Sequence, residues 1–150
     1  VSYLRPSNID GAKHSWAILA LLVKRLRQAW PDVQITFRGD SGFCRHRMLN
    51  WCERKDVRYI VGLAKNRRLK RLSQLWIEQA RTHYEATQQK QRVFTDLHYK
   101  AATWRCRRRV ILKAEHMSQG SNPRYVVTTF FACCNSVATN YANSVSHSNC

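Results

Sequence analysis

The stretch that most constrains the fold begins at Val33 and reads Val-Gln-Ile-Thr-Phe-Arg-Gly-Asp-Ser-Gly-Phe. Its apolar side chains, Val33, Ile35 and Phe37, alternate with polar ones, which predicts a β-strand with one buried face. Asp40 follows directly after this strand, and Ser41 can cap the helix that comes next. A carboxylate held at a strand end and open to solvent suits a metal ligand. Asp40 could equally serve only as part of the helix cap, and the spacing leaves both interpretations open.

The residues on either side of this strand predict an α/β fold. Apolar residues recur every three or four positions through residues 12–30, which predicts an amphipathic helix that covers a sheet. A second helical pattern at residues 44–55 is followed by an apolar run at residues 57–62 that is typical of a strand. Strand, helix and strand in such close succession predict a parallel, right-handed β-α-β unit. Asp40 would then lie at the carboxyl edge of the sheet, where ligands and metals gather.

The second half of the chain changes pattern. A helix through residues 72–83 is expected to bury Leu72 and Leu75, and it ends before residue 92. Three strands joined by polar turns are expected after it, at residues 92–99, 102–112 and 125–130. These patterns divide the chain into an α/β part at residues 1–91, an antiparallel β part at 92–130 and a tail at 131–150. The tail carries no Lys, Arg, Asp or Glu and has no periodicity, so we expect it to be mobile.

The charge of the chain indicates an anionic partner. A net charge of +17 on 150 residues makes the compact state repel itself, so it does not help the fold. Nucleic acid is the first candidate partner and an anionic membrane surface the second. No apolar run approaches the ~20 residues of a membrane span, so no span is expected.

Two groups of basic residues are candidates for contact with nucleic acid. The first follows the strand at 57–62 and would lie beside the Asp40 edge. Its members are Lys65, Arg67, Arg68, Lys70 and Arg71. The second would project from the strand at 102–112, with its side chains about 7 Å apart on one face. Its members are Arg105, Arg107 and Arg109, with Trp104 and Cys106 on the opposite, apolar face. A charge run is often only a solvated surface, and that interpretation stays open for both groups.

The six cysteines do not indicate a metal site. They contain no Cys-x-x-Cys pair and no matching histidine spacing, so a structural zinc site is not expected. Cys44 and Cys52 fit the apolar side of a helix as small core residues. A reducing, cytosolic setting is the default expectation.

Five blocks in chain order resemble the transposases of bacterial insertion sequences, of the DDE type with a ribonuclease-H-like core. They are Leu-Arg-Pro-Ser-Asn-Ile-Asp-Gly from residue 4, Arg-Gly-Asp-Ser-Gly-Phe from residue 38, Trp-Cys-Glu from residue 51, Tyr-Ile-Val-Gly-Leu-Ala-Lys-Asn from residue 59, and Lys-Ala-Glu-His through Asn-Pro-Arg-Tyr-Val-Val-Thr at residues 113–128. The blocks cover about residues 1–129. The resemblance implies a partial ribonuclease-H-like mixed sheet with flanking helices and an antiparallel β insertion.

The resemblance also implies a site. In that family two Asp and one Glu bind two Mg²⁺ ions, or Mn²⁺, which promote attack on a DNA phosphate. The role of the second Asp carries over onto Asp40, and Arg38 joins the basic residues as a DNA contact. The resemblance implies terminal-repeat and target DNA as partners, a possible homodimer, no membrane and a nucleoid setting. The first Asp is expected upstream of Val1 and the Glu in a motif that the sequence does not reach, with a departure from the family pattern near Phe130.

Three hypotheses follow from these expectations. The chain could be a fragment of a DDE transposase that does not cut DNA by itself, because two Mg²⁺ ions need about three carboxylates. It could be a basic nucleic-acid-binding module without chemistry. It could be a decayed remnant that does not fold stably. Asp10 and Asp56 could approach Asp40 in space, but neither matches a catalytic position of the family.

Overall fold

The computed structural model describes residues 8 and 10–130, and all structural statements below refer to these residues. The helices are α1 (Ser15–Ala29), α2 (His46–Arg54), α3 (Arg67–Leu72) and α4 (Gln74–Thr87), with a short 3-10 helix, η1 (Ser41–Phe43). The strands are β1 (Thr36–Gly39), β2 (Arg58–Leu63), β3 (Gln91–Tyr99), β4 (Arg108–Met117), β5 (Gly120–Ser121) and β6 (Arg124–Thr128). The expected strand near residue 1 and the tail after residue 130 lie outside the described residues.

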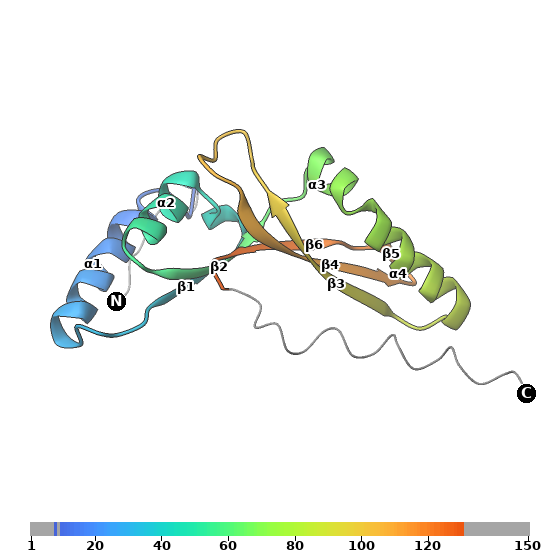
Figure 1. The fold of residues 1–150 in the computed structure, drawn as a ribbon, viewed down its shortest axis with the longest axis horizontal. Coiled ribbons are helices and arrows are strands. Elements are labelled where there is room, and N and C mark those ends of the chain that lie inside the picture. The colour runs from blue at the N-terminus through green and yellow to red at the C-terminus, as the bar shows by residue number, and fades with distance from the viewer. Residues whose placement is uncertain (1–7, 9, 131–150) are drawn as a thin grey trace, which may run out of the picture.

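The strands form one mixed sheet in the order β1-β2-β6-β4-β3, with β5 paired to β4 (Figure 1). β1 and β2 are parallel, which confirms the β-α-β unit, and the other pairs are antiparallel. The α/β fold class with a mixed sheet is therefore confirmed, and it is consistent with a ribonuclease-H-like fold.

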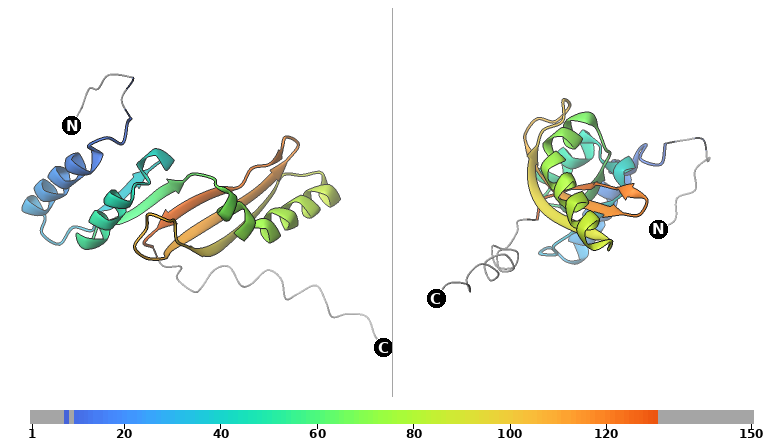
Figure 2. Two further views of the ribbon diagram at one scale, coloured as in Figure 1. Left: turned by 90° about the horizontal axis from the view of Figure 1, so that it is seen from above. Right: turned by 90° about the vertical axis from the view of Figure 1, so that its right-hand side faces the viewer.

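The core lies on one face of this sheet. Val61 pairs with Val127, Val127 with Val110, and Val110 with Leu97, so these four side chains share a face, and all are buried. α2 packs on β2, and α4 packs on β3 and β4, from the same side of the sheet (Figures 1 and 2). Burial of this apolar row against the two helices is the main stabilising contribution to the fold.

The first helix is placed differently from the expectation. The predicted helix at residues 12–30 exists as α1, but it packs against α2 at one end of the molecule instead of covering the sheet (Figure 2). Val23 is its buried residue, whereas Trp16 is 47% exposed and Trp30 62% exposed. An amphipathic stripe shows that one face is apolar, but it does not show what that face meets.

The prediction of which residues are buried in the helix after β2 is wrong for Leu72 and Leu75. Leu72 and Leu75 are 43% and 73% exposed, and Leu69 and Ala80 are buried instead. The helix is interrupted at Ser73, whose buried hydroxyl lies 2.7 Å from the hydroxyl of Tyr125 and donates to a carbonyl of the preceding turn. Because α3 ends before Ser73 and α4 begins after it, the helical repeat does not run through this residue. The buried positions of the two helices therefore do not follow one continuous pattern.

Among the described residues, no helix is both long enough and apolar enough to cross a membrane.

Candidate metal and DNA site at the sheet edge

Asp40 lies at the carboxyl end of β1, exposed to solvent, as the sequence predicts. It is also the N-cap of η1, because its Oδ1 accepts a hydrogen bond of 2.8 Å from the backbone N–H of Gly42. Ser41, the expected cap, is instead the first residue of η1. The two interpretations of Asp40 are therefore compatible, since capping occupies one oxygen and a carboxylate has a second one.

The backbone of Asp40 is held by the close approach of strand β2 to the turn after β1. Gly62 on β2 lies so near the turn that a Cβ placed on it would be 2.9 Å from the Ser41 nitrogen and 3.2 Å from the Asp40 carbonyl carbon. Only a glycine leaves room for this contact. The sequence contains the signal, a glycine inside an apolar strand, but the sequence analysis did not assign Gly62 a role.

The other two acids considered for this edge are placed differently from each other. Asp56 lies in the turn before β2, at the opposite end of that strand from Asp40. Asp10 forms an ion pair of 2.7 Å with Arg45, whose Nε donates to the carbonyl of Gly42. Asp10 is therefore linked to the turn after Asp40 through Arg45, whereas Asp56 does not approach it.

The described residues do not fit a two-metal site. Within residues 8 and 10–130 there is no group of three or more His, Cys, Asp or Glu side chains that could hold a metal ion. Magnesium requires near-octahedral oxygen ligation, and two ions require more carboxylates than Asp40 alone. The described part of the chain therefore provides one carboxylate toward such a site and not the site itself.

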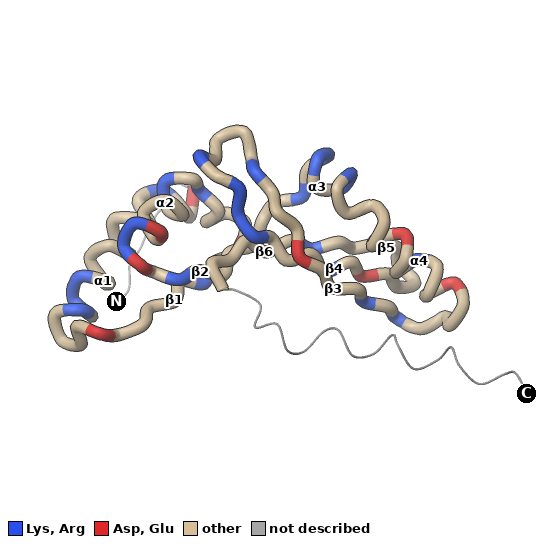
Figure 3. The backbone as a smooth tube through the Cα atoms, in the orientation of Figure 1, with Lys and Arg blue, Asp and Glu red and all other residues tan. Residues whose placement is uncertain are grey.

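The first basic group leaves the sheet at the same edge as Asp40. Lys65 follows the carboxyl end of β2, which lies beside the carboxyl end of β1, and its Nζ donates to Asn122 at 2.9 Å. Asn66 caps α3 through a 2.9 Å bond from the Leu69 nitrogen. All five members of the group are exposed: Lys65, Arg67, Arg68, Lys70 and Arg71. Arg38 is exposed on β1. The group therefore starts at the carboxyl end of β2, and the blue segments of α3 in Figure 3 show its further course.

The expected row of guanidinium groups on one strand is wrong. β4 begins at Arg108, so Arg105 and Arg107 lie in the loop at residues 100–107 and not in a strand. Arg109 is in β4 but forms an ion pair of 2.9 Å with Asp96. Trp104 is buried as expected, whereas Cys106 is exposed. The pairing with β3 determines where β4 starts, and this long-range partner cannot be identified from local alternation.

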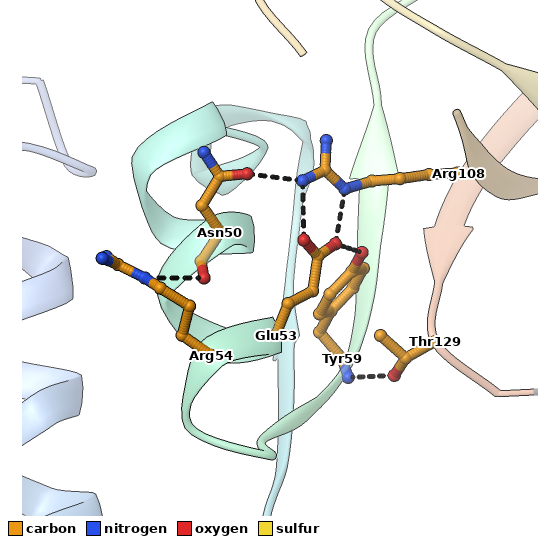
Figure 4. Close-up of polar contacts among 6 residues, drawn as sticks. All are labelled: Asn50, Glu53, Arg54, Tyr59, Arg108 and Thr129. Carbon is orange, nitrogen blue, oxygen red and sulfur yellow. Dashed lines mark hydrogen bonds and ion pairs between the residues drawn. The ribbon is translucent and has the colours of Figure 1, made fainter. Parts of the chain in front are cut away.

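A buried ionic network joins α2, β2 and β4 (Figure 4). The Nε and Nη2 atoms of Arg108 donate to the two carboxylate oxygens of Glu53 at 2.6 and 2.9 Å. Arg108 also donates to the Asn50 side chain at 2.6 Å, and the Tyr59 hydroxyl donates to Glu53 at 2.8 Å. The Arg108 guanidinium lies over the ring of Trp104, 4.9 Å from its centre. The side chain of Arg108 is 3% exposed, so its charge depends on this arrangement.

The network shifts the acidity of its members. Burial alone would raise the pKa of Glu53, but hydrogen bonds from Arg108 and Tyr59 outweigh it and leave that pKa below its ordinary value. Burial, and then the bond to Glu53, raise the pKa of Tyr59. Arg108 therefore stays charged and Tyr59 stays protonated at neutral pH. This indicates that the network stabilises the fold and does not transfer protons. Nothing in the sequence relates positions 53 and 108, so this pair could not be predicted from it.

A family model described as transposase DDE domain group 1 matches residues 1–142. The match extends past Phe130, where the sequence analysis placed the departure from the family pattern. No curated protein and no solved structure gives a significant match to the chain.

Proposed function

The chain belongs to the transposase DDE domain group 1 family, and from that premise we propose that it contributes Asp40 as one carboxylate of a divalent-metal site for DNA cleavage and strand transfer. Its function is of the transposase type, and the family implies DNA as a partner. The observation that carries the proposal is the exposed carboxylate of Asp40 at the carboxyl end of β1, held there by the contact with Gly62.

The chemistry of the site requires oxygen ligands on a rigid support. A divalent ion held there would be Mg²⁺ or Mn²⁺, which in this family supplies charge stabilisation to the attacked DNA phosphate. Asp40 would bind such an ion through the oxygen that does not cap η1. The backbone of Asp40 lies against Gly62 of β2, and the hydrogen bond from the Gly42 nitrogen restricts the position of its carboxylate.

The exposed basic residues supply the DNA contact in this proposal. Lys65 and the cations of α3 follow the carboxyl end of β2 and are exposed, although Lys65 donates to Asn122 and Arg68 to the carbonyl of Lys100. Phosphate contacts by Lys and Arg position a DNA backbone and make its binding depend on salt. The two features together would place a phosphate near Asp40.

We propose further that this polypeptide by itself binds DNA without cutting or joining it. Supporting this is the lack, within residues 8 and 10–130, of any group of three metal-binding side chains. The test is incubation of the protein with Mg²⁺ or Mn²⁺ and DNA that carries the terminal repeats of its element. No nicking is expected. Metal-dependent nicking that is lost in Asp40→Ala would contradict this second proposal while supporting the role of Asp40.

A second candidate is a nucleic-acid-binding module without a metal-dependent role, and the lack of any group of three metal-binding side chains among the described residues favours it. The two candidates differ in their response to metal. If Asp40 binds an ion beside DNA, Mg²⁺ strengthens DNA binding by the wild type and not by Asp40→Asn. If the chain is only a basic module, binding weakens with salt in the same way for both proteins.

A further inference from the structure

A cavity of about 580 Å³ lies between α1, α2 and the loop at residues 100–107. Its lining combines two aromatic side chains with three cations: Trp16, Trp51, Arg47, Arg54 and Arg105. Asp40 is not part of this lining. The cavity is thus distinct from the carboxylate at the sheet edge, and neither the family match nor the proposed function assigns it a ligand.

The three guanidinium groups in this cavity form no ion pair with any carboxylate that the structure describes. Within residues 8 and 10–130, no carboxylate lies within 4.0 Å of a guanidinium nitrogen of Arg47, Arg54 or Arg105. The one acid in the lining is Glu53, and its carboxylate already accepts hydrogen bonds from Nε and Nη2 of Arg108. All three arginines are exposed, so their charge is available to a ligand.

A second cavity, of about 770 Å³, adjoins the first one at the loop, and its lining includes one further acid, Asp56. The two share Glu53 and Cys106 in their linings, and the second adds Arg58 and Arg107, both exposed. Neither of these arginines has a carboxylate partner within 4.0 Å among the described residues. A chain of phosphates longer than one nucleotide could therefore follow cations from α2 to the start of β2.

The aromatic residues determine which polyanion fits. Trp16 is 47% exposed, so its indole can accept a flat ring. Trp51 is half-buried. A base in a duplex has its faces covered by its neighbours, whereas an unpaired base can stack on an aromatic side chain while the backbone follows a basic groove. From this combination we propose that the groove formed by the two cavities binds single-stranded DNA. The proposal goes beyond the proposed function, because it involves neither Asp40 nor a metal.

The test is fluorescence anisotropy of the whole protein with a labelled single strand of about 20 nucleotides in EDTA. We expect Arg54→Ala/Arg105→Ala to weaken binding about tenfold or more at low salt and to lower the slope of log affinity against log salt by about 1.4. Trp16→Ala should weaken binding by about five- to hundredfold. Arg25→Ala is the matched control, because Arg25 is exposed on α1 and lines neither cavity. It should change affinity by less than about threefold.

Three outcomes would overturn the proposal. One is an equal loss of affinity in Arg25→Ala and in a single Arg54→Ala variant, since the groove would then be only part of a general positive surface. Another is equally tight binding of a duplex. The third is competition by a deoxynucleoside monophosphate at the same concentration as the oligonucleotide, which would indicate a free nucleotide as the ligand. Circular dichroism of each variant confirms its fold, and Arg54→Lys, which keeps the charge, should retain most of the affinity.

Failure of this proposal is distinguishable from failure of the proposed function. The single-strand assay contains EDTA and therefore reports on the groove without a metal, whereas the proposed function is tested by whether Asp40→Asn removes the effect of Mg²⁺ on duplex binding.

Discussion

Removal of the Glu53 carboxylate is the perturbation whose effect the structure determines most closely. Glu53→Gln keeps the size of the side chain and removes its charge. The Arg108 guanidinium, 3% exposed, then remains buried with its nearest counter-charge gone. Its Nη1 atom already has no hydrogen-bond partner among the described residues, so the site has no reserve acceptor for that group.

The expected cost follows from the burial of each partner. Breaking a buried ion pair costs about 3–5 kcal/mol when one charge is left uncompensated. Because the Glu53 side chain is 32% exposed, water screens part of the interaction, and we expect the low end, about 3 kcal/mol. Arg108→Met should cost only about 1–2 kcal/mol, since the remaining Glu53 can be hydrated. The double variant should cost about as much as Arg108→Met alone, which gives a coupling energy of about 3 kcal/mol.

The assay is urea unfolding followed by tryptophan fluorescence at neutral pH for the four members of this cycle. The stability that Glu53 contributes is fully present above the unfolded pKa of about 4.3 and is lost as the pH falls through its lower folded pKa. The difference between wild type and Glu53→Gln should therefore shrink in acid. Two results would refute a stabilising coupling between Glu53 and Arg108. One is a loss of less than about 1 kcal/mol in the free energy of unfolding for Glu53→Gln, and the other is a double variant whose loss equals the sum of the two single losses.

Three further predictions concern other sites. Gly62→Ala should lower stability by about 1–3 kcal/mol in a thermal melt, because its Cβ would be 2.9 Å from a backbone nitrogen of the turn after β1. Glu115, whose pKa is held at about 2 by Lys and Arg partners, contributes stability that is lost as the pH falls from about 4.3 toward 2, so Glu115→Gln should flatten the acid limb of a pH-stability curve. Burial raises the pKa of the Cys52 thiol to about 11, so alkylation followed by peptide mapping at neutral pH should label exposed Cys106 and spare Cys52 in the folded protein. Equal labelling of the two would contradict that packing.

Local pattern was sufficient for the part of the fold that carries Asp40. The first strand, the helix after it and the strand at Arg58–Leu63 are present, and Asp40 lies at the strand end, but the first strand begins at Thr36 and not at Val33. These features depend on neighbours in sequence, because a strand that is followed by a helix and another strand returns parallel beside the first one.

The remaining features depend on contacts between distant positions. The start of β4 at Arg108 results from its pairing with β3, and this start removed the expected arginine row. The same register turns Arg108 toward Glu53 and leaves Arg105 and Arg107 in a loop that borders a groove. No local property of residues 102–107 indicates this difference, since alternating apolar and basic residues suit a strand and an exposed loop equally.

The central claim is that Asp40 binds a divalent metal ion beside DNA, and paramagnetic broadening by Mn²⁺ tests it most directly. In amide NMR spectra of the protein with duplex DNA, Mn²⁺ should selectively broaden the signals of residues 39–43. Asp40→Asn should abolish this broadening, whereas Asp56→Asn, at the other end of β2, should retain it. Broadening that is absent from residues 39–43, or that is unchanged in Asp40→Asn, would contradict the claim.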